Sequence, residues 1–294
     1  MAHLLVVSLI WAFSFGLIKG NLQGLDPSFV SWVRMTLSLL VFLPFLRPAQ
    51  MKWRQAWQLI VLGGVQYGLM YVFYIASFET LKAHQVALST VLTPLFVVGL
   101  EAWTTRTLRA RFALAALLAV GGAALLNPDP TCLGAWKGML LVQGSNLCFA
   151  VGQVWYRRLG RGPTPDRSSF ALAYAGAVLV TGMAALLTND SIPSSLTFTQ
   201  IWTLGYLGFV ASGICFFLWN VGAKATNAGV LAVFNNVKIP LAVLVSLLVF
   251  GESAQWSRLL SASAMIALAL WLGARTSKQA SPEKALASVR NDTK

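Results

Sequence analysis

The chain consists of ten long apolar runs in succession, and this feature limits its possible folds more than any other. Each run is bounded by charged residues, Gly or Pro, and is close to the roughly 20 residues that a helix needs to cross a bilayer. The runs are residues 3–19, 27–46, 57–78, 84–103, 108–126, 134–156, 168–188, 200–221, 228–250 and 256–274. Because they are continuous rather than alternating, they predict transmembrane helices and not strands. With 57% hydrophobic and 11% charged residues, the chain leaves no room for a soluble catalytic domain.

Lys and Arg are distributed unevenly among the connections between these runs. Sixteen of the 22 fall in every second connection or in the C-terminal tail, whereas four fall in the alternate connections. Cytoplasmic loops of membrane proteins are enriched in Lys and Arg. The distribution therefore predicts ten spans with the N and C termini both in the cytoplasm. It also accounts for the net charge of +13 without a nucleic-acid partner.

A weak internal repeat relates the two halves of the chain. The matching pairs, at offsets of 142 to 146 residues, are Gln58 and Gln200, Leu62 and Leu204, Gly63 and Gly205, Thr80 and Thr226, and Pro94 and Pro240. A unit of five helices that repeats must enter the membrane with the opposite orientation. We therefore predict an all-α integral membrane protein of two inverted five-helix repeats, residues 1–126 and 127–274, around a central cavity. Residues 275–294 form a polar, basic cytoplasmic tail.

The pattern resembles a known family of carriers. Trp11 is followed by small residues, the fourth and ninth runs each contain a proline, and Phe250-Gly251-Glu252 closes the ninth run. These features are similar to those of the drug/metabolite transporter superfamily, EamA type, and most of all to its YddG-type aromatic amino-acid exporters. The first repeat departs from the pattern, because Arg106-Thr107 stands where its own Gly-Glu is expected. The resemblance implies a ten-helix carrier that exports small metabolites across the cell inner membrane.

One basic residue is expected near the middle of the membrane. Lys238 lies about ten residues into the ninth run, which is roughly 15 Å along a helix. Asn235 and Asn236 precede it, and Pro240 leaves backbone carbonyls without a donor. These residues are candidates for binding a substrate carboxylate, with Pro240 and Pro94 as hinges. In the alternative interpretation, Lys238 extends to the cytoplasmic edge or bonds to neighbouring carbonyls.

Aromatic side chains supply a second group of candidates. Tyr67, Tyr71 and Tyr74 have the spacing of one helical face, and Trp11 lies in the middle of the first run. Such a wall suits an aromatic solute, although helix packing explains the same spacing. Arg34, in the second run, either contacts substrate or extends to the outer surface.

The remaining candidates are polar or aromatic residues expected inside or at the ends of spans. They are His84, Asn146, Gln153, Trp219 and Asn220. Buried amides in membranes more often connect helices than bind ligands, so interhelical hydrogen bonding is the alternative for this group.

The nine acidic residues all fall at span ends, in loops or in the tail. A proton-coupled carrier commonly uses a buried carboxylate, so we predict a uniporter that works by alternating access, without cofactor or metal and as a monomer in the lipid bilayer. An aromatic or neutral amino acid is the predicted substrate, with a hydrophobic cation or drug as the alternative. A lipid-modifying enzyme is a remote third possibility, because we find no catalytic residue set.

Overall fold

The computed structural model describes residues 2–47, 51–105, 133–159, 166–188, 193 and 195–225, together with isolated positions between 245 and 271. Several predictions fall outside these residues. They concern Asn235, Asn236, Lys238, Pro240, the span at 108–126, most of the spans at 228–250 and 256–274, and the tail at 275–294.

The described residues form helices and no strand, so the all-helical prediction is confirmed for this part of the chain. The helices are α1 (Ala2–Asn21), α2 (Pro27–Phe42), α3 (Trp53–Gly63), α4 (Met70–Ser77), α5 (Ala83–Ser89), α6 (Thr93–Thr105), α8 (Leu133–Leu159), α9 (Asp166–Leu187), α10 (Phe198–Gly205) and α11 (Cys215–Ala225). Five stretches of this part are long and apolar enough to cross a membrane: Leu4–Asn21, Pro27–Phe45, Trp53–Ser77, Asp166–Leu187 and Phe198–Ala223.

Local sequence explains where several helices begin. The Asp26 carboxylate accepts a hydrogen bond from the Phe29 amide at 2.7 Å, and Pro27 occupies the first helical position of α2. Thr197 and Gln200 form a reciprocal capping box at the start of α10. Gly24, in the turn between α1 and α2, has a φ of 89°, which a residue without Cβ adopts at no steric cost.

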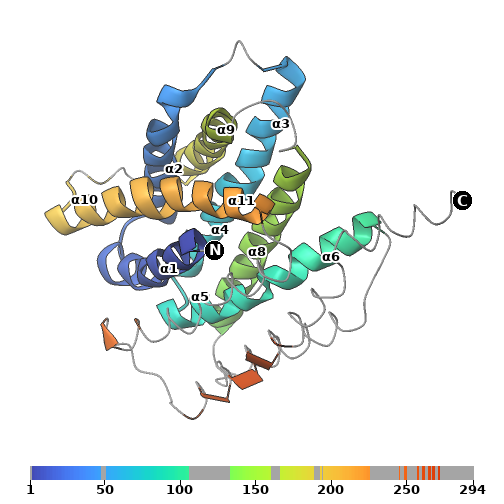
Figure 1. Cartoon of the computed structure of the whole chain (residues 1–294). Coiled ribbons are helices and arrows are strands. Elements are labelled where there is room, and N and C mark those ends of the chain that lie inside the picture. Colours follow the sequence, from blue (N-terminus) through green and yellow to red (C-terminus); the bar gives the residue numbers. More distant parts are fainter. Residues whose placement is uncertain are drawn as a thin grey trace, which may run out of the picture.

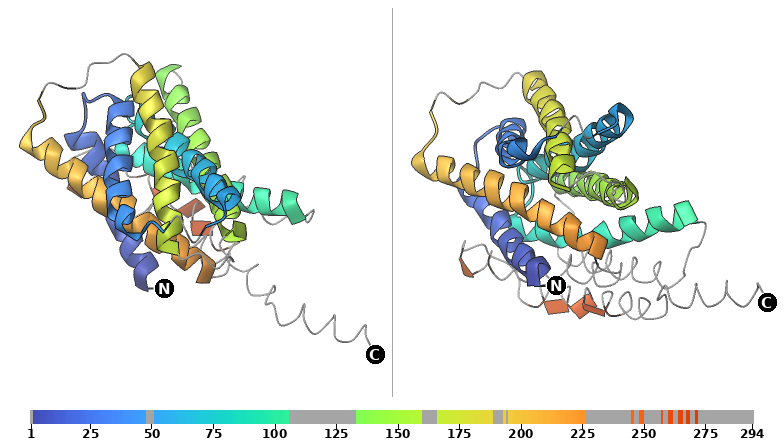
Figure 2. Two further views of the ribbon diagram at one scale, coloured as in Figure 1. Left: turned by 90° about the horizontal axis from the view of Figure 1, so that it is seen from above. Right: turned by 45° about the horizontal axis from the view of Figure 1, so that its top comes forward.

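Two of the long spans contain a wide helical segment. In the third span, the π-helical segment η3 (Gly64–Leu69) joins α3 to α4. In the eighth, the π-helical segment η5 (Tyr206–Ile214) joins α10 to α11. Each trio forms one continuous rod, and α10–η5–α11 packs against α1 along its length (Figure 1, Figure 2). Both π-helical segments begin directly after the Leu-Gly pair that the internal repeat matches.

Helix α9 lies between α2 and α3 and packs on both (Figure 1). At its crossing with α3, a Cβ on Gly63 would overlap the backbone of Ala173, and a Cβ on Gly176 would overlap the carbonyl of Ile60. The two backbones approach this closely because both crossing positions are glycine, as is common between transmembrane helices.

The fourth span is interrupted. Helix α5 ends at Ser89, the 3₁₀ turn η4 (Thr90–Leu92) follows, and α6 begins at Thr93. Pro94 lacks the amide that would bond to the carbonyl of Thr90, and the Thr93 hydroxyl lies 2.8 Å from that carbonyl as its donor. The helix is therefore interrupted just before Pro94, which the sequence predicted as a hinge. Motion about it is untested and stays a prediction.

Candidate substrate cavity

A cavity opens where several helices meet. Its wall combines residues of α1, α2, α4, η4, α6, α8 and α11. The lining residues are Trp11, Ser14, Phe15, Arg34, Met70, Tyr71, Tyr74, Thr90, Thr93, Ser145, Asn146, Phe149 and Phe216. Segments far apart in the sequence thus contribute to one site, as in carriers that bind solute between helices.

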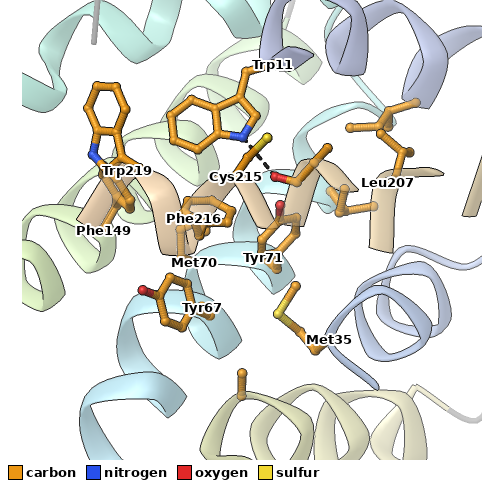
Figure 3. Close-up of a cluster of buried hydrophobic side chains, with 14 of the residues drawn as sticks. Trp11, Met35, Tyr67, Met70, Tyr71, Phe149, Leu207, Cys215, Phe216 and Trp219 are labelled. Atoms are coloured by element: carbon orange, nitrogen blue, oxygen red, sulfur yellow. Dashed lines mark hydrogen bonds between the residues drawn. The ribbon is translucent and has the colours of Figure 1, made fainter. Parts of the chain in front are cut away.

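Aromatic rings form one side of the cavity. The Trp11 indole lies 4.9 Å from the ring of Phe216 and 5.1 Å from that of Trp219, between ring centroids. Its Nε1 donates to the carbonyl of Ala211 at 2.9 Å, the dashed line in Figure 3. This bond fixes the orientation of the Trp11 ring, which lines the cavity as a flat apolar surface.

The three predicted tyrosines are not equivalent. Tyr71 and Tyr74 line the cavity, whereas Tyr67 lies outside the lining, and its hydroxyl accepts a hydrogen bond from Asn220 at 3.0 Å. Tyr67 stacks instead on Tyr174 of α9. The common face predicted from a spacing of four assumed an α-helix. Tyr67 lies in η3, where a turn takes more residues, so its direction relative to Tyr71 and Tyr74 differs from that in an α-helix.

Asn146 of α8 connects the cavity wall to the interrupted fourth span. Its Nδ2 donates to the carbonyl of Ser89 at 3.0 Å, and its Oδ1 lies 2.9 Å from the Thr93 hydroxyl, whose single hydrogen is shared between this oxygen and the Thr90 carbonyl. Gln143 donates to the same Ser89 carbonyl at 3.2 Å. In lipid, a carbonyl released by a helix break must find another donor. Asn146 fills this role while forming part of the wall.

Arg34 of α2 is held by two neighbouring spans. Its Nη2 donates to the Tyr71 hydroxyl at 2.9 Å and to Ser212 Oγ at 3.0 Å, and its Nε donates to Ser212 Oγ at 3.2 Å. The guanidinium carbon lies 4.5 Å from the centroid of the Tyr71 ring. Arg34 therefore does not extend to the outer surface, which was one of the two interpretations of its sequence position.

The other predicted site residues lie outside the cavity lining. His84 is buried in α5 and Gln153 in α8, while Trp219 packs against Trp11 and Asn220 bonds to Tyr67. Gln66 Nε2 lies 3.5 Å from Asn220 Oδ1. These contacts fit the interhelical alternative for Asn220.

Sequence reasoning missed eight of the lining residues: Ser14, Phe15, Met70, Thr90, Thr93, Ser145, Phe149 and Phe216. Helical spacing carried a signal for some of them. Ser14 and Phe15 follow Trp11 by three and four residues, and Phe149 follows Asn146 by three. Nothing in the sequence distinguishes Phe216 from the neighbouring aromatic residues of its span.

The fold and the cavity define a polytopic membrane protein with a cavity between its helices. The EamA-like transporter family model matches residues 1–127 and again 136–274. The chain belongs to this family, and it is a membrane transporter of the inner membrane.

Relatives in several bacteria match over most of the chain. The protein named biotin transporter of Salmonella typhimurium is 38% identical over 275 residues, which cover 92% of each chain. The protein of that name from Escherichia coli K12 is 37% identical with the same coverage. A probable biotin transporter of Pseudomonas aeruginosa is 37% identical over 92% of this chain and 96% of its own.

A solved crystal structure has the same fold. It superposes with a TM-score of 0.68 over 94% of this chain and 96% of its own, at 20% sequence identity. At that identity the likeness concerns the fold alone.

Proposed function

We propose that this protein is a carrier for biotin. The observation that supports this most is the identity of 37–38% with proteins named biotin transporter or probable biotin transporter, over 92% of the chain. The comparisons do not support the amino-acid substrate expected from the sequence. That substrate class is therefore the competitor in the experiments below.

The cavity wall fits a solute of this chemistry. Biotin has a compact bicyclic ring system with a polar ureido group, an apolar chain and a terminal carboxylate. Trp11, Phe149 and Phe216 offer an aromatic surface for the ring and chain. The Thr93 hydroxyl oxygen and Asn146 Oδ1 offer acceptor lone pairs for the ureido N–H groups, since their own hydrogens are used within the protein. A few convergent polar groups within an apolar wall are typical of small-molecule sites.

The carrier is proposed to have ten spans in two inverted repeats, residues 1–126 and 127–274, with both ends in the cytoplasm. Two matches of one family model, at 1–127 and 136–274, support two repeats. The Lys and Arg asymmetry supports the orientation. Rocking of the repeats about hinges at Pro94 and Pro240 would expose the cavity to each side in turn, within a single monomer.

Transport is proposed to be passive. Asp26 caps α2, Glu79 follows α4, and Asp166 begins α9, so these carboxylates lie at helix ends rather than in the cavity. A proton relay through the membrane commonly needs a carboxylate inside it. A pH gradient across liposomes should then leave the final biotin distribution unchanged, and uphill accumulation driven by the gradient would contradict uniport.

Flux through purified protein in liposomes tests the substrate. Labelled biotin should enter vesicles loaded with unlabelled biotin faster than empty vesicles, because a carrier exchanges solute across the membrane. Tryptophan, phenylalanine and a lipophilic cation serve as competitors at equal concentration. Displacement by biotin alone is the expected result, whereas transport of an aromatic amino acid or of the cation without biotin transport would overturn the proposal.

A further inference from the structure

Arg34 is a charged side chain inside the membrane-spanning part of the molecule. It is the eighth of the sixteen residues of α2, it is 1% exposed, and it belongs to the cavity wall. An ionised side chain at membrane depth costs free energy, and such residues pair with an opposite charge or mark a solute pathway.

The hydrogen-bond donors of Arg34 are only partly used. A guanidinium has five N–H groups and no acceptor. Ser212 and Tyr71 accept from Nε and Nη2, which leaves the two N–H groups of Nη1. Nη1 is buried and has no hydrogen-bond partner within the part of the chain that the structure describes. A buried donor without a partner is costly, so a ligand oxygen at Nη1 would be stabilised.

The positive charge is also uncompensated among the described residues. Ser212 and Tyr71, which hold Arg34, are neutral hydroxyl donors and acceptors, and no carboxylate of this part of the chain bonds to it. The two hydroxyls lie 2.9 Å apart and fix the guanidinium in one orientation. Such a prepared cation favours an anion, because the cost of ordering the long side chain is already met in the free carrier.

We propose that Arg34 binds the carboxylate of the transported solute through Nη1, with Ser212 and Tyr71 as positioning residues. The proposal rests on the proposed function and assigns the acidic end of the substrate to a site. Trp11 and Phe216 then face the apolar body of the same molecule across the cavity. The substrate class is a small monocarboxylate with an apolar or aromatic body.

The position of Ser212 strengthens this assignment. Ser212 lies in the π-helical segment η5, and Tyr71 lies two residues after η3. The guanidinium therefore joins α2 to both spans that contain a π-helical segment. A change in the conformation of either span would move the Arg34 guanidinium. The orientation of the guanidinium is therefore coupled to the opening of the cavity.

Acid and amide pairs of one solute test the proposal. The full-length protein, purified in detergent, is titrated with biotin and with biotinamide, which replaces the carboxylate by a neutral carboxamide of similar shape. The wild type is expected to prefer biotin by about 10–100-fold, the range for a charge-assisted hydrogen bond. In Arg34→Gln the ratio of the two affinities should fall to about one. Arg34→Lys should retain part of the preference, because Lys keeps the positive charge but lacks the paired N–H donors of a guanidinium.

Leu40→Ala is the matched control, because Leu40 lies on the same helix and is 51% exposed. This variant should keep the wild-type preference. Equal binding of biotin and biotinamide by the folded wild type would overturn the proposal while leaving biotin as substrate. Loss of the preference in Lys238→Gln, but not in Arg34→Gln, would also overturn it and would assign the carboxylate to Lys238.

Two further outcomes are separable. If the wild type binds no biotin, the proposed substrate is wrong, and the titration is repeated with phenylalanine and phenylalanine amide. A preference for phenylalanine over its amide that is lost in Arg34→Gln would still support Arg34 as the carboxylate site. If Arg34→Gln does not fold, Arg34→Lys takes its place in the test. An unchanged preference for the acid over the amide in both Arg34→Lys and Tyr71→Phe would contradict the assignment of the carboxylate to Arg34.

Discussion

The third and eighth spans use the same backbone deformation in different surroundings. Each contains a π-helical segment, η3 or η5, that begins directly after a Leu-Gly pair. Against α9 the backbone of η3 and its flank makes close steric contacts: Gly63 meets the backbone of α9, and a Cβ on Gly68 would lie 2.8 Å from the Cβ of Val180. The side-chain donors Ser31 and Ser77 bond to the carbonyls of Tyr71 and Tyr74, which belong to α4 and not to η3.

Around η5 the contacts are polar. Three helices donate side-chain hydrogen bonds to its carbonyls: Trp11 to Ala211, Tyr174 to Ser212 at 2.6 Å, and Ser38 to Gly208 at 2.9 Å. A π-helical segment disturbs the regular backbone ladder, and lipid offers no substitute donor. One segment is thus held by close packing and the other by donors. This difference predicts that substitutions at matching positions near η3 and η5 change the stability of the protein by different mechanisms.

The largest effect is expected at the paired glycines Gly63 and Gly205. A Cβ at Gly63 overlaps the backbone of Ala173, so Gly63→Ala should destabilise the protein by about 2–3 kcal/mol, as overpacking does. At Gly205 no described atom lies within 4 Å of a Cβ, and Gly205→Ala should stabilise its helix by up to about 1 kcal/mol. Thermal melts in detergent, read by size-exclusion chromatography, measure both. Equal shifts for the two variants would contradict the comparison.

The helices themselves were predictable, whereas the π-helical segments were not. Apolar runs bounded by charge or Gly located α1, α2, α8 and α9 to within a few residues, because membrane thickness sets their length. A π-helical segment needs no distinctive residue, so the sequence contained no sign of η3, and Tyr67 was assigned to the cavity for that reason.

The site was predictable only in part, because its polar contacts join distant segments. Trp11, Tyr71, Tyr74 and Asn146 stood out as unusual residues within apolar runs, and the cavity wall contains them. Ser212 did not, since a serine in a span can bond to its own helix. Its role depends on Arg34, 178 residues away. Only the fold brings these two residues together.

A smaller effect is expected at Tyr174, which tests the polar side of the comparison. Its hydroxyl donates to Ser212 O at 2.6 Å and lies 3.2 Å from Gly213 O, and the residue is outside the cavity lining. Tyr174→Phe should destabilise the protein by about 1–2 kcal/mol, because a buried carbonyl loses its donor. Biotin affinity of the remaining folded protein should be unchanged.

Tyr206→Phe is the control for this variant, since Tyr206 lies at the start of η5 and its hydroxyl has no hydrogen bond among the described residues. It should melt as the wild type does. If both phenylalanine variants melt alike, the carbonyls of η5 do not depend on the Tyr174 hydroxyl.

Ser212→Ala is expected to act on selectivity more than on stability. The change removes the oxygen that accepts from Nε and Nη2 of Arg34, while Tyr71 still accepts from Nη2. The guanidinium is then less fixed, so the preference for biotin over biotinamide should fall by about 3–10-fold, with a smaller change in melting temperature. A shift in melting temperature with an unchanged preference would indicate that Ser212 only connects helices.

The smallest effect is expected for Ser38→Ala alone, and its size depends on Tyr174. The Ser38 hydroxyl has one hydrogen, and it lies 2.9 Å from both the Gly208 and the Arg34 carbonyls. Losing it should cost about 0.5 kcal/mol, which the better helix propensity of Ala partly offsets. If donors hold η5 as one unit, Ser38→Ala should cost more in the Tyr174→Phe background than in the wild type, by at least about 0.5 kcal/mol. Strict additivity in this double-mutant cycle would mean that each carbonyl is satisfied independently, and η5 would then resemble η3 in deriving its stability from packing.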